Sequence, residues 1–234
     1  MSADSKPTLR IASWNIRKGL GTDLRRDADR VLAGIAALQA DIVALQEADF
    51  RLGDRPSALP RDRIAAATGL EPLSIGRNAV SLGWHGNALL ARPGIRVRGL
   101  EHLDLPGLEP RGAVIVDLDT PAPLRVVAVH LGLFRAARRR QLDAIRAALQ
   151  HHPVRPTVIL GDFNERSQRV GLGRIAGSFA ILHTAPTFPS HRPFLPLDRI
   201  VHSPDLELVP LTHPRSRGPQ PSDHLPLLAE LHWR

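Results

Sequence analysis

The decisive stretch of the chain is TVILGDFNER, residues 157–166, in which a short apolar run is followed at once by polar side chains. The run Val158–Leu160 is bounded by turn-forming residues, a pattern typical of a buried strand. Asp162 and Asn164 then stand at the end of that strand. Because ionisable groups beside a core are costly to bury unless they are paired, we expect these side chains to face a bound partner.

Composition limits the class of protein. The chain has 234 residues, of which 43% are hydrophobic, enough for one substantial core and few for two domains. It contains no cysteine, which excludes disulfides and thiolate metal sites and leaves imidazole, carboxylate and amide groups as metal ligands. No apolar run of about 18 residues occurs and the first residues lack a secretory apolar core, so we expect no transmembrane segment and a cytoplasmic location.

The charge balance has two interpretations. The formal net charge of +8 suits a phosphate-bearing partner. Of the 31 basic residues, however, two are lysines, Lys6 and Lys18, and the other 29 are arginines. So uneven a ratio is also what biased codon usage in a GC-rich genome produces. The excess of arginine is therefore functional or compositional, and the sequence leaves both open.

Apolar residues follow helical spacing in some segments and strand-like runs in others. Helices are predicted over Asp29–Gln39 and Arg138–Gln150. Strands are predicted at Leu9–Ile16, Ile42–Gln46, Asn87–Ala91, Ala113–Leu118, Val126–Leu131, Val158–Leu160, Arg199–His202 and Leu227–Leu231. Together these elements predict one mixed α/β domain.

Polar groups stand at the termini of six predicted strands. They are Asn15, Glu47, His130, Asp162 with Asn164, Asp198, and Asp223 with His224. Taken singly, each is most simply a capping or turn residue. If the termini converge, the set is rich in oxygen ligands and has no thiolate, which favours Mg²⁺ or Mn²⁺ over zinc.

The same termini carry short motifs in a characteristic order. WNI, LQE, GNALL, VVAVHLG, GDFNE, LDRI and SDHLPL, spread over residues 9–233, closely resemble the endonuclease/exonuclease/phosphatase superfamily. The resemblance implies an α/β (α+β) fold, a four-layer αββα sandwich whose two mostly antiparallel sheets pack face to face with helices outside. It implies one such domain over residues 9–234, which leaves residues 1–8 as a disordered or loosely ordered N-terminus.

The resemblance also implies a metal site. Glu47 of LQE corresponds to the principal Mg²⁺ ligand, with Asn15 beside it and Asp223 near the metal. Asp162 and Asn164 correspond to the pair that orients the attacking water and binds the metal or the phosphate. The implied cofactor is Mg²⁺, for which Mn²⁺ can substitute.

Catalytic and phosphate-binding groups follow from the same likeness. His224 corresponds to the catalytic histidine at the scissile phosphate, Asp198 to the carboxylate paired with it, and His130 to a donor to a phosphate oxygen. Arg17 stands where deoxyribonuclease-like members carry an arginine and abasic-site endonucleases an acidic residue, although an exposed loop arginine is an equal reading. Arg111 enters a strand next to the site strands in order and is a further candidate for phosphate contact.

The chemistry of phosphate ester hydrolysis requires these residue types, independently of the family resemblance. A phosphodiester resists attack because its oxygens are negative, so a dication and imidazolium donors are needed to neutralise the charge that grows in the transition state. A carboxylate beside a histidine fixes the tautomer of the ring and raises its pKa, which lets it act near neutrality. The sequence thus predicts a metal-dependent hydrolase of phosphoric esters, nuclease-like in its motifs.

The substrate stays open. The first hypothesis is a phosphodiesterase acting on nucleic acid or a phospholipid headgroup; the alternatives are a phosphomonoesterase on a small metabolite such as an inositol phosphate, and a catalytically silent binding protein. Aromatic residues are 4% of the chain, sparse for stacking bases, and no long apolar loop suited to a lipid surface is evident. Ser81–Gly86 and Ala185–Pro196 are candidate specificity loops, and we expect a monomer.

Overall fold

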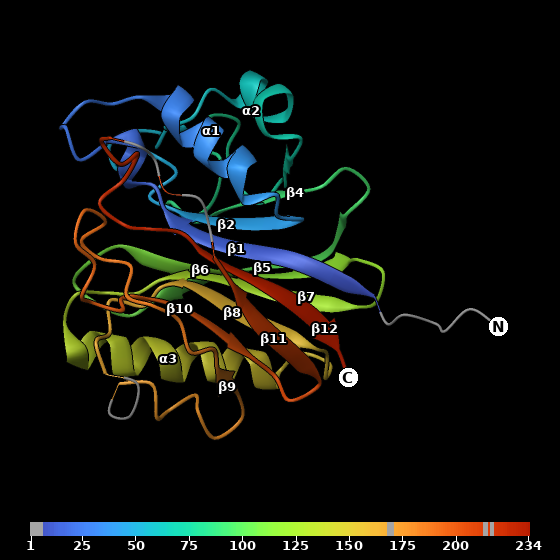
Figure 1. Ribbon diagram of the computed structural model, residues 1–234. Coiled ribbons are helices and arrows are strands. Elements are labelled where there is room, and N and C mark those ends of the chain that lie inside the picture. The colour runs from blue at the N-terminus through green and yellow to red at the C-terminus, as the bar shows by residue number, and fades with distance from the viewer. Residues whose placement is uncertain (1–6, 168–170, 213–214, 216–217) are drawn as a thin grey trace.

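The computed structural model describes residues 7–167, 171–212, 215 and 218–234, and in them two six-stranded sheets pack face to face (Figure 1). The first sheet has the order β11-β12-β1-β2-β4-β3 and the second the order β5-β6-β7-β8-β10-β9. The strands are β1 (Thr8–Asn15), β2 (Ile42–Gln46), β3 (Glu71–Pro72), β4 (Ala88–Ala91), β5 (Arg96–Leu105), β6 (Arg111–Asp119), β7 (Leu124–His130), β8 (Thr157–Asp162), β9 (Ala180–Ile181), β10 (Asp198–His202), β11 (Leu206–Leu211) and β12 (Leu227–Trp233). The helices are the 3-10 turn η1 (Arg17–Gly19), α1 (Ala28–Leu38), α2 (Arg61–Thr68) and α3 (Arg135–Gln150).

Each sheet contains a single parallel pair, β1 with β2 in the first and β7 with β8 in the second, and its other neighbouring strands are antiparallel. Helices α1 and α2 cover the outer face of the first sheet, and α3 covers the outer face of the second (Figure 1). The predicted four-layer αββα sandwich with mostly antiparallel sheets is therefore confirmed.

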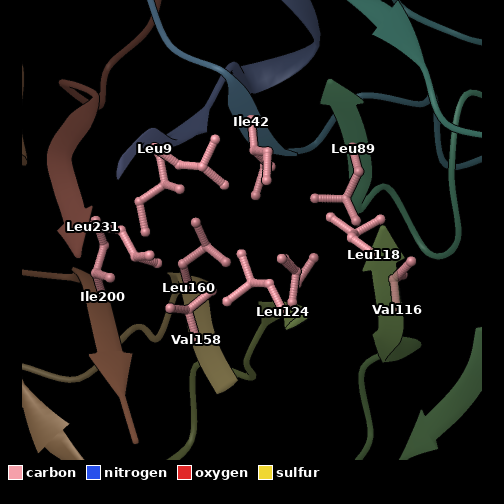
Figure 2. Close-up of a cluster of buried hydrophobic side chains, with 14 of the residues drawn as sticks. Leu9, Ile42, Leu89, Val116, Leu118, Leu124, Val158, Leu160, Ile200 and Leu231 are labelled. Carbon is pink, nitrogen blue, oxygen red and sulfur yellow. The ribbon is translucent and has the colours of Figure 1, made fainter. Parts of the chain in front are cut away.

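The main core lies between the two sheets. Figure 2 shows Leu9, Ile42 and Leu89 of the first sheet facing Val158 and Leu160 of the second, all of them buried. Successive side chains of a strand point to opposite faces, so the residue between the last two, Ile159, packs instead in the cluster beneath α3. Because both faces of β8 are covered, its sequence is a continuous apolar run rather than an alternating one.

The helices bury the stripes that their spacing indicates. Helix α1 begins after Asp27, whose side chain accepts a hydrogen bond from the backbone N–H of Arg30 at 3.0 Å, the normal N-cap arrangement. It ends where Gln39 adopts a left-handed conformation with φ 50°. The helices predicted at 29–39 and 138–150 are thus confirmed, with α3 starting three residues earlier than expected.

Several elements escaped the sequence patterns. The expected strand list lacks β5 and β11, which lie at edges of the two sheets and alternate with exposed residues, and it lacks the two-residue strands β3 and β9. Helix α2 was also missed because it buries one large side chain, Ile64. At the N-terminus β1 begins at Thr8, one residue before the expected start, while residues 1–6 lie outside the described residues.

The topology brings many chain ends to one side of the sandwich. Strands β1, β2, β7 and β8 end there and β4, β6, β10 and β12 begin there, at the left of Figure 1. The polar groups that the sequence places at strand termini therefore gather at one end. No helix of the described residues is long and apolar enough to cross a membrane.

Candidate active site

A pocket of about 670 Å³ opens at this end between the two sheets. Nine of the ten predicted site residues line it: Asn15, Arg17, Glu47, Arg111, His130, Asp162, Asn164, Asp223 and His224. The tenth, Asp198, is fully buried directly behind His224. The structure thus brings all ten predicted residues together.

Strand register accounts for the convergence. Asp162, the last residue of β8, lies opposite His130 in the parallel ladder and opposite Asp198 in the antiparallel one. Asn15 ends β1 in the facing sheet, and its side-chain Nδ2 donates to Asp162 Oδ2 at 3.0 Å. One hydrogen bond therefore links the site across the two sheets.

Asp162 is the most connected group of the site. Its Oδ2 lies 3.4 Å from His130 Nε2 and 3.8 Å from His224 Nε2, in addition to accepting from Asn15. Its Oδ1 accepts from the backbone N–H of Asn164 at 2.9 Å. Burial, reinforced by the neighbouring charge of Asp198, raises the pKa of Asp162 to about 6. Such a carboxyl gains and loses a proton close to neutrality.

His224 is held by a carboxylate on its far side. Asp198 Oδ2 lies 2.9 Å from Nδ1 of the ring and also accepts a hydrogen bond from Thr187 Oγ1. Burial alone would lower the pKa of His224, but the carboxylates of Asp198 and Asp162 outweigh it and raise that pKa to about 9. The ring is therefore an imidazolium at neutral pH, with Nε2–H directed towards Asp162 and the pocket.

The ring of His130 is neutral, in contrast to that of His224. Burial and the adjacent cation of Arg111 keep its pKa well below the ordinary value of histidine. Arg111 Nη1 lies 3.0 Å from Nδ1 of the ring, and a guanidinium can only donate, so Nδ1 is the acceptor. The proton of this neutral ring accordingly sits on Nε2, which faces Asp162 Oδ2.

Lys18 is a site residue that sequence reasoning missed. Its ammonium forms an ion pair with Glu47 Oε2, while Glu47 Oε1 lies 3.8 Å from Arg51 Nη2. Burial and the cations of Arg51 and Arg26 lower the pKa of Lys18 to about 8. One signal was available: Lys18 is one of two lysines in the chain and stands directly after the WNIR segment.

The oxygen donors fit a hard divalent cation. Glu47 offers a carboxylate, Asn15 an amide oxygen and Asp223 a second carboxylate, and all three line the pocket. The ammonium of Lys18 already pairs with Glu47, so this carboxylate has a cation beside it on the side of the pocket. One or two carboxylates with remaining positions for water is the donor set that Mg²⁺ favours.

A second group, Asp162, Asp198 and His224, has potential ligand atoms within 4.8 Å of one another. Asp198 Oδ2 in this group already accepts hydrogen bonds from His224 and Thr187. Its geometry is that of an imidazole oriented by a carboxylate, so the first set of donors is the better fit for a cation.

Two buried arginines hold the loops of the site in place. Arg138 donates from Nη2 to Glu165 Oε2 at 2.9 Å, and from Nη1 to the backbone oxygen of Gly132. Arg199, 1% exposed inside β10, donates to the backbone oxygens of Asp198 and Glu165 at 3.1 Å each. The sequence signal for this role of Arg199 was an arginine inside an otherwise apolar strand.

Backbone strain concentrates at the pocket. Eight non-glycine residues of the described chain have positive φ, and four of them, Arg17, Lys18, Glu47 and Asn164, line the pocket. Left-handed conformations cost such residues free energy, so the surrounding structure must impose them. Strain of this kind at Glu47 (φ 53°) and Asn164 (φ 51°) is typical of a functional site.

Both candidate specificity loops reach the site. In Ala185–Pro196, Phe188 and Leu195 line the pocket, and the Phe188 ring lies 4.9 Å from the His224 ring. In Ser81–Gly86, His85 and Gly86 line a smaller cavity of about 70 Å³ beside Glu47.

Comparison with known proteins identifies the family of the chain. Residues 12–224 match the Endonuclease/Exonuclease/phosphatase family. The chain belongs to this family. Its members are hydrolases that act on phosphoester bonds. The uncharacterized protein YbhP of Escherichia coli K12 is 32% identical to this chain over 248 aligned residues, which cover 96% of each chain.

Solved structures of the family share the fold. A protein of the Endonuclease/Exonuclease/phosphatase family from Bacteroides vulgatus superposes with a TM-score of 0.75 at 20% identity and covers 98% of this chain and 100% of that one. The mannosyl-6-phosphatase Bt3783 of Bacteroides thetaiotaomicron superposes with a TM-score of 0.73 at 19% identity, covering 96% and 100%. At these identities the likeness shows the fold.

Proposed function

We propose that this chain hydrolyses a phosphodiester by means of an activated water and a bound divalent cation. The observation that carries the proposal is the placement of His224 between two carboxylates. Asp198 lies 2.9 Å from its Nδ1 and Asp162 3.8 Å from its Nε2, which leaves a charged N–H directed into a pocket lined by arginines. A protonated, oriented imidazole beside a titratable carboxyl is suited to acid–base chemistry at a phosphate.

Each side chain has a role that follows from its state. Asp162, with a pKa of about 6, accepts a proton from the attacking water near neutral pH. The Nε2–H of His224 donates to an oxygen of the phosphate and stabilises the negative charge that grows there. The backbone N–H of Asn164 donates to Oδ1 of Asp162 and the side chain of Asn15 donates to Oδ2, so the carboxylate is held in one orientation towards the pocket.

Cations of the pocket wall bind the substrate phosphate. Arg111 is buried, paired with Glu109, and held against His130, so its charge is fixed in position. Arg17 Nε lies 3.2 Å from Asp223 Oδ2 and is half-exposed, which leaves it free to contact the ester as well. Fixed positive groups of this kind stabilise a phosphoryl transition state without having to reorganise.

A divalent cation complements these residues. Family members in general depend on one, and Glu47, Asn15 and Asp223 are the residues that would hold it here. When bound, it supplies Lewis-acid neutralisation of the phosphate oxygens. Mg²⁺ fits the hard oxygen set, with Mn²⁺ as its substitute.

A second candidate is phosphomonoester hydrolysis at the same site. Besides the His224 imidazolium, the pocket is lined by seven arginine and lysine side chains, Arg17, Lys18, Arg26, Arg51, Arg111, Arg138 and Arg166, against four carboxylates, Glu47, Asp162, Glu165 and Asp223. That excess would suit the dianion of a monoester or an inositol phosphate. The structural neighbour Bt3783 is by its name a mannosyl-6-phosphatase.

A substrate panel tests the proposal. Plasmid DNA, RNA, sphingomyelin, phosphatidyl lipids and inositol phosphates are each incubated with Mg²⁺ and with EDTA, and released groups are measured for wild type and His224→Ala. We expect cleavage of a diester in Mg²⁺, absent in EDTA and in the variant. Cleavage confined to monoesters would favour the second candidate, and no cleavage of any substrate would favour a silent binding protein.

A further inference from the structure

Exposed apolar side chains are unevenly distributed over the molecule. Among the described residues, ten large apolar side chains are exposed. Leu100 and Val209 lie within edge strands, and Val154 lies in the turn before β8, at the end opposite the pocket. The other seven lie in loops that join elements at the pocket end, as the strand pairing requires: Leu24, Leu52, Val80, Leu108, Leu133, Phe134 and Phe194.

Five of these seven line the pocket or are adjacent in sequence to a residue that lines the pocket or its side cavity, and Leu24 lies two positions before the pocket residue Arg26. We call the six, which are 63% to 93% exposed, the apolar ring: Leu24, Leu52, Leu108, Leu133, Phe134 and Phe194. Leu52 follows the pocket residue Arg51, Phe194 precedes Leu195, and Leu133 itself lines the pocket. The six residues come from five separate loops, all at the end of the sandwich where the pocket opens.

Singly exposed leucines are normal on soluble proteins, but their concentration at the end of the molecule that carries the pocket indicates a binding surface. The ring residues come one or two at a time from loops far apart in sequence. A scan for a long apolar loop therefore finds none of them, and the fold alone assembles them.

The loops that carry the seven residues are also strongly cationic. In segments 17–27, 47–60, 73–87, 106–110, 131–139 and 182–197, seven arginines are exposed: Arg25, Arg26, Arg51, Arg77, Arg135, Arg139 and Arg192. Two carboxylates are exposed there, Asp23 and Asp54, and Asp23 is paired with Arg30 at 3.0 Å. An apolar tip beside an arginine occurs at Leu24–Arg25, Arg51–Leu52 and Phe134–Arg135.

This combination fits the surface of an anionic bilayer. Apolar tips gain free energy by entering the boundary between headgroups and acyl chains, and arginines beside them are attracted to lipid phosphates. Duplex or single-stranded nucleic acid would use the arginines but would leave the leucines exposed to water, because recognition there depends on phosphate contacts and aromatic stacking. The leucines therefore favour lipid over nucleic acid.

We infer that the apolar ring docks this chain on an anionic membrane surface, so that the pocket receives the phosphate ester of a lipid headgroup. This inference rests on the proposed function and names the substrate class of the same site. The ring places the pocket opening against the lipid surface, where the phosphates of the headgroups lie.

Vesicle sedimentation tests the docking directly. Wild type is mixed with vesicles of phosphatidylcholine alone or of phosphatidylcholine with phosphatidylglycerol, and the bound fraction is measured. We expect binding to the mixed vesicles that is weakened by salt. The variant Leu24→Ser/Leu52→Ser/Leu108→Ser/Phe134→Ser, which leaves the pocket lining untouched, is expected to bind about tenfold more weakly or worse, because membrane affinity scales with buried apolar area.

A matched control removes exposed apolar groups elsewhere. Leu100→Ser/Val154→Ser/Val209→Ser lies outside the ring and should bind vesicles as wild type does. A soluble chromogenic phosphodiester measures the site itself and should be cleaved equally by wild type and both variants. Thermal unfolding of each variant checks that the fold is retained.

The outcomes separate the inference from the proposed function. If wild type cleaves the soluble ester but does not sediment with mixed vesicles, or if the ring variant sediments as wild type does, docking is overturned and the hydrolase stands. If wild type sediments and the ring variant does not, while neither cleaves any ester, docking stands and the hydrolase fails. Binding to duplex DNA or dimerisation that the ring variant abolishes, without vesicle binding, would assign the ring to another partner and overturn the inference.

Discussion

Asp198 Oδ2 lies 2.9 Å from Nδ1 of His224, 26 residues further along the chain, and both groups are buried. The same oxygen accepts from Thr187 Oγ1, while Oδ1 of Asp198 has no hydrogen-bond partner in the described part of the chain. One carboxylate oxygen thus fixes the imidazole, and the histidine proton on Nδ1 is committed to it. The nitrogen of His224 that is left to face the pocket is therefore Nε2.

Replacing Asp198 by Asn tests this relationship. The change is nearly isosteric but removes the charge that holds the ring charged and in one orientation. We expect turnover to fall by roughly two or more orders of magnitude, as for the orienting carboxylate of hydrolytic triads. Steady-state kinetics with a soluble diester measures it, and circular dichroism checks the fold. Thr187→Val, which removes the other partner of that oxygen, should cost much less; unchanged turnover in Asp198→Asn would mean that the pair has no catalytic role.

The charge on His224 also predicts how stability depends on pH. Its pKa is raised from about 6.5 in the unfolded chain to about 9 in the fold, where Asp198 and Asp162 outweigh burial. A raised pKa on a base stabilises the fold fully below pH 6.5, and that contribution is lost as the pH rises through 9. The whole effect is on the order of 3 kcal/mol.

Urea unfolding in EDTA between pH 6 and pH 9 measures this effect without metal. Other groups also titrate in that range, so the useful quantity is the difference between wild type and Asp198→Asn. We expect the stability of wild type to fall relative to the variant as the pH rises. A difference that stays constant with pH would contradict the charged pair.

The metal site predicts a separation of binding from folding. Glu47→Gln keeps the shape of the side chain and removes the carboxylate that Mg²⁺ prefers. We expect Mg²⁺ affinity, measured by calorimetry, to fall about tenfold or more, with little change in unfolding free energy. Glu101→Gln, on β5 and paired with His152, is the matched control and should bind metal normally. Full activity in EDTA, or activity restored by Zn²⁺ alone, would refute a Mg²⁺ site.

Lys18 should compete with the metal. Its ammonium pairs with Glu47 Oε2, so a cation that binds there must displace it. Lys18→Met is therefore expected to raise Mg²⁺ affinity severalfold, as measured by calorimetry. Arg51→Met is the control: Arg51 is 63% exposed and lies 3.8 Å from the other oxygen, so its removal should have a smaller effect. If Lys18→Met binds Mg²⁺ no more tightly than wild type, Lys18 does not compete with the metal.

The sequence predicted those features of the fold and the site that depend on residues close together along the chain. The apolar run of β8 could be recognised because both faces of that strand are covered, and the polar residues after it could be recognised because the strand ends at the pocket. The exposed edge strand β5 gave no such run, since alternate positions face water. The resemblance supplied the partnership of Asp198 and His224, which no spacing rule contains.

The parts that could not be predicted depend on three-dimensional packing. The ion pair of Lys18 with Glu47 joins two loops 29 residues apart, and long side chains give no indication of their partner. Arg199 spans from β10 to the backbone oxygen of Glu165, 34 residues away. The apolar ring has no sequence signature at all, because single leucines in polar loops look incidental until the fold brings the loops together.

Gly161, just before Asp162, predicts where the site is least tolerant of change. Its φ is +151°, and a Cβ there would lie 1.9 Å from the backbone oxygen of Val129 on β7. An alanine must therefore push β7 and β8 apart, and we expect Gly161→Ala to lower the free energy of unfolding by about 3 kcal/mol or more. Gly177→Ala is the matched control, because its Cβ would meet no atom within 4 Å, and it should change stability by about 0.5 kcal/mol at most. Urea unfolding of both variants measures the difference. Similar midpoints would mean that β7 and β8 can separate without cost in free energy. The close approach of the two strands, which positions His130 beside Asp162, would then be less rigid than its geometry implies.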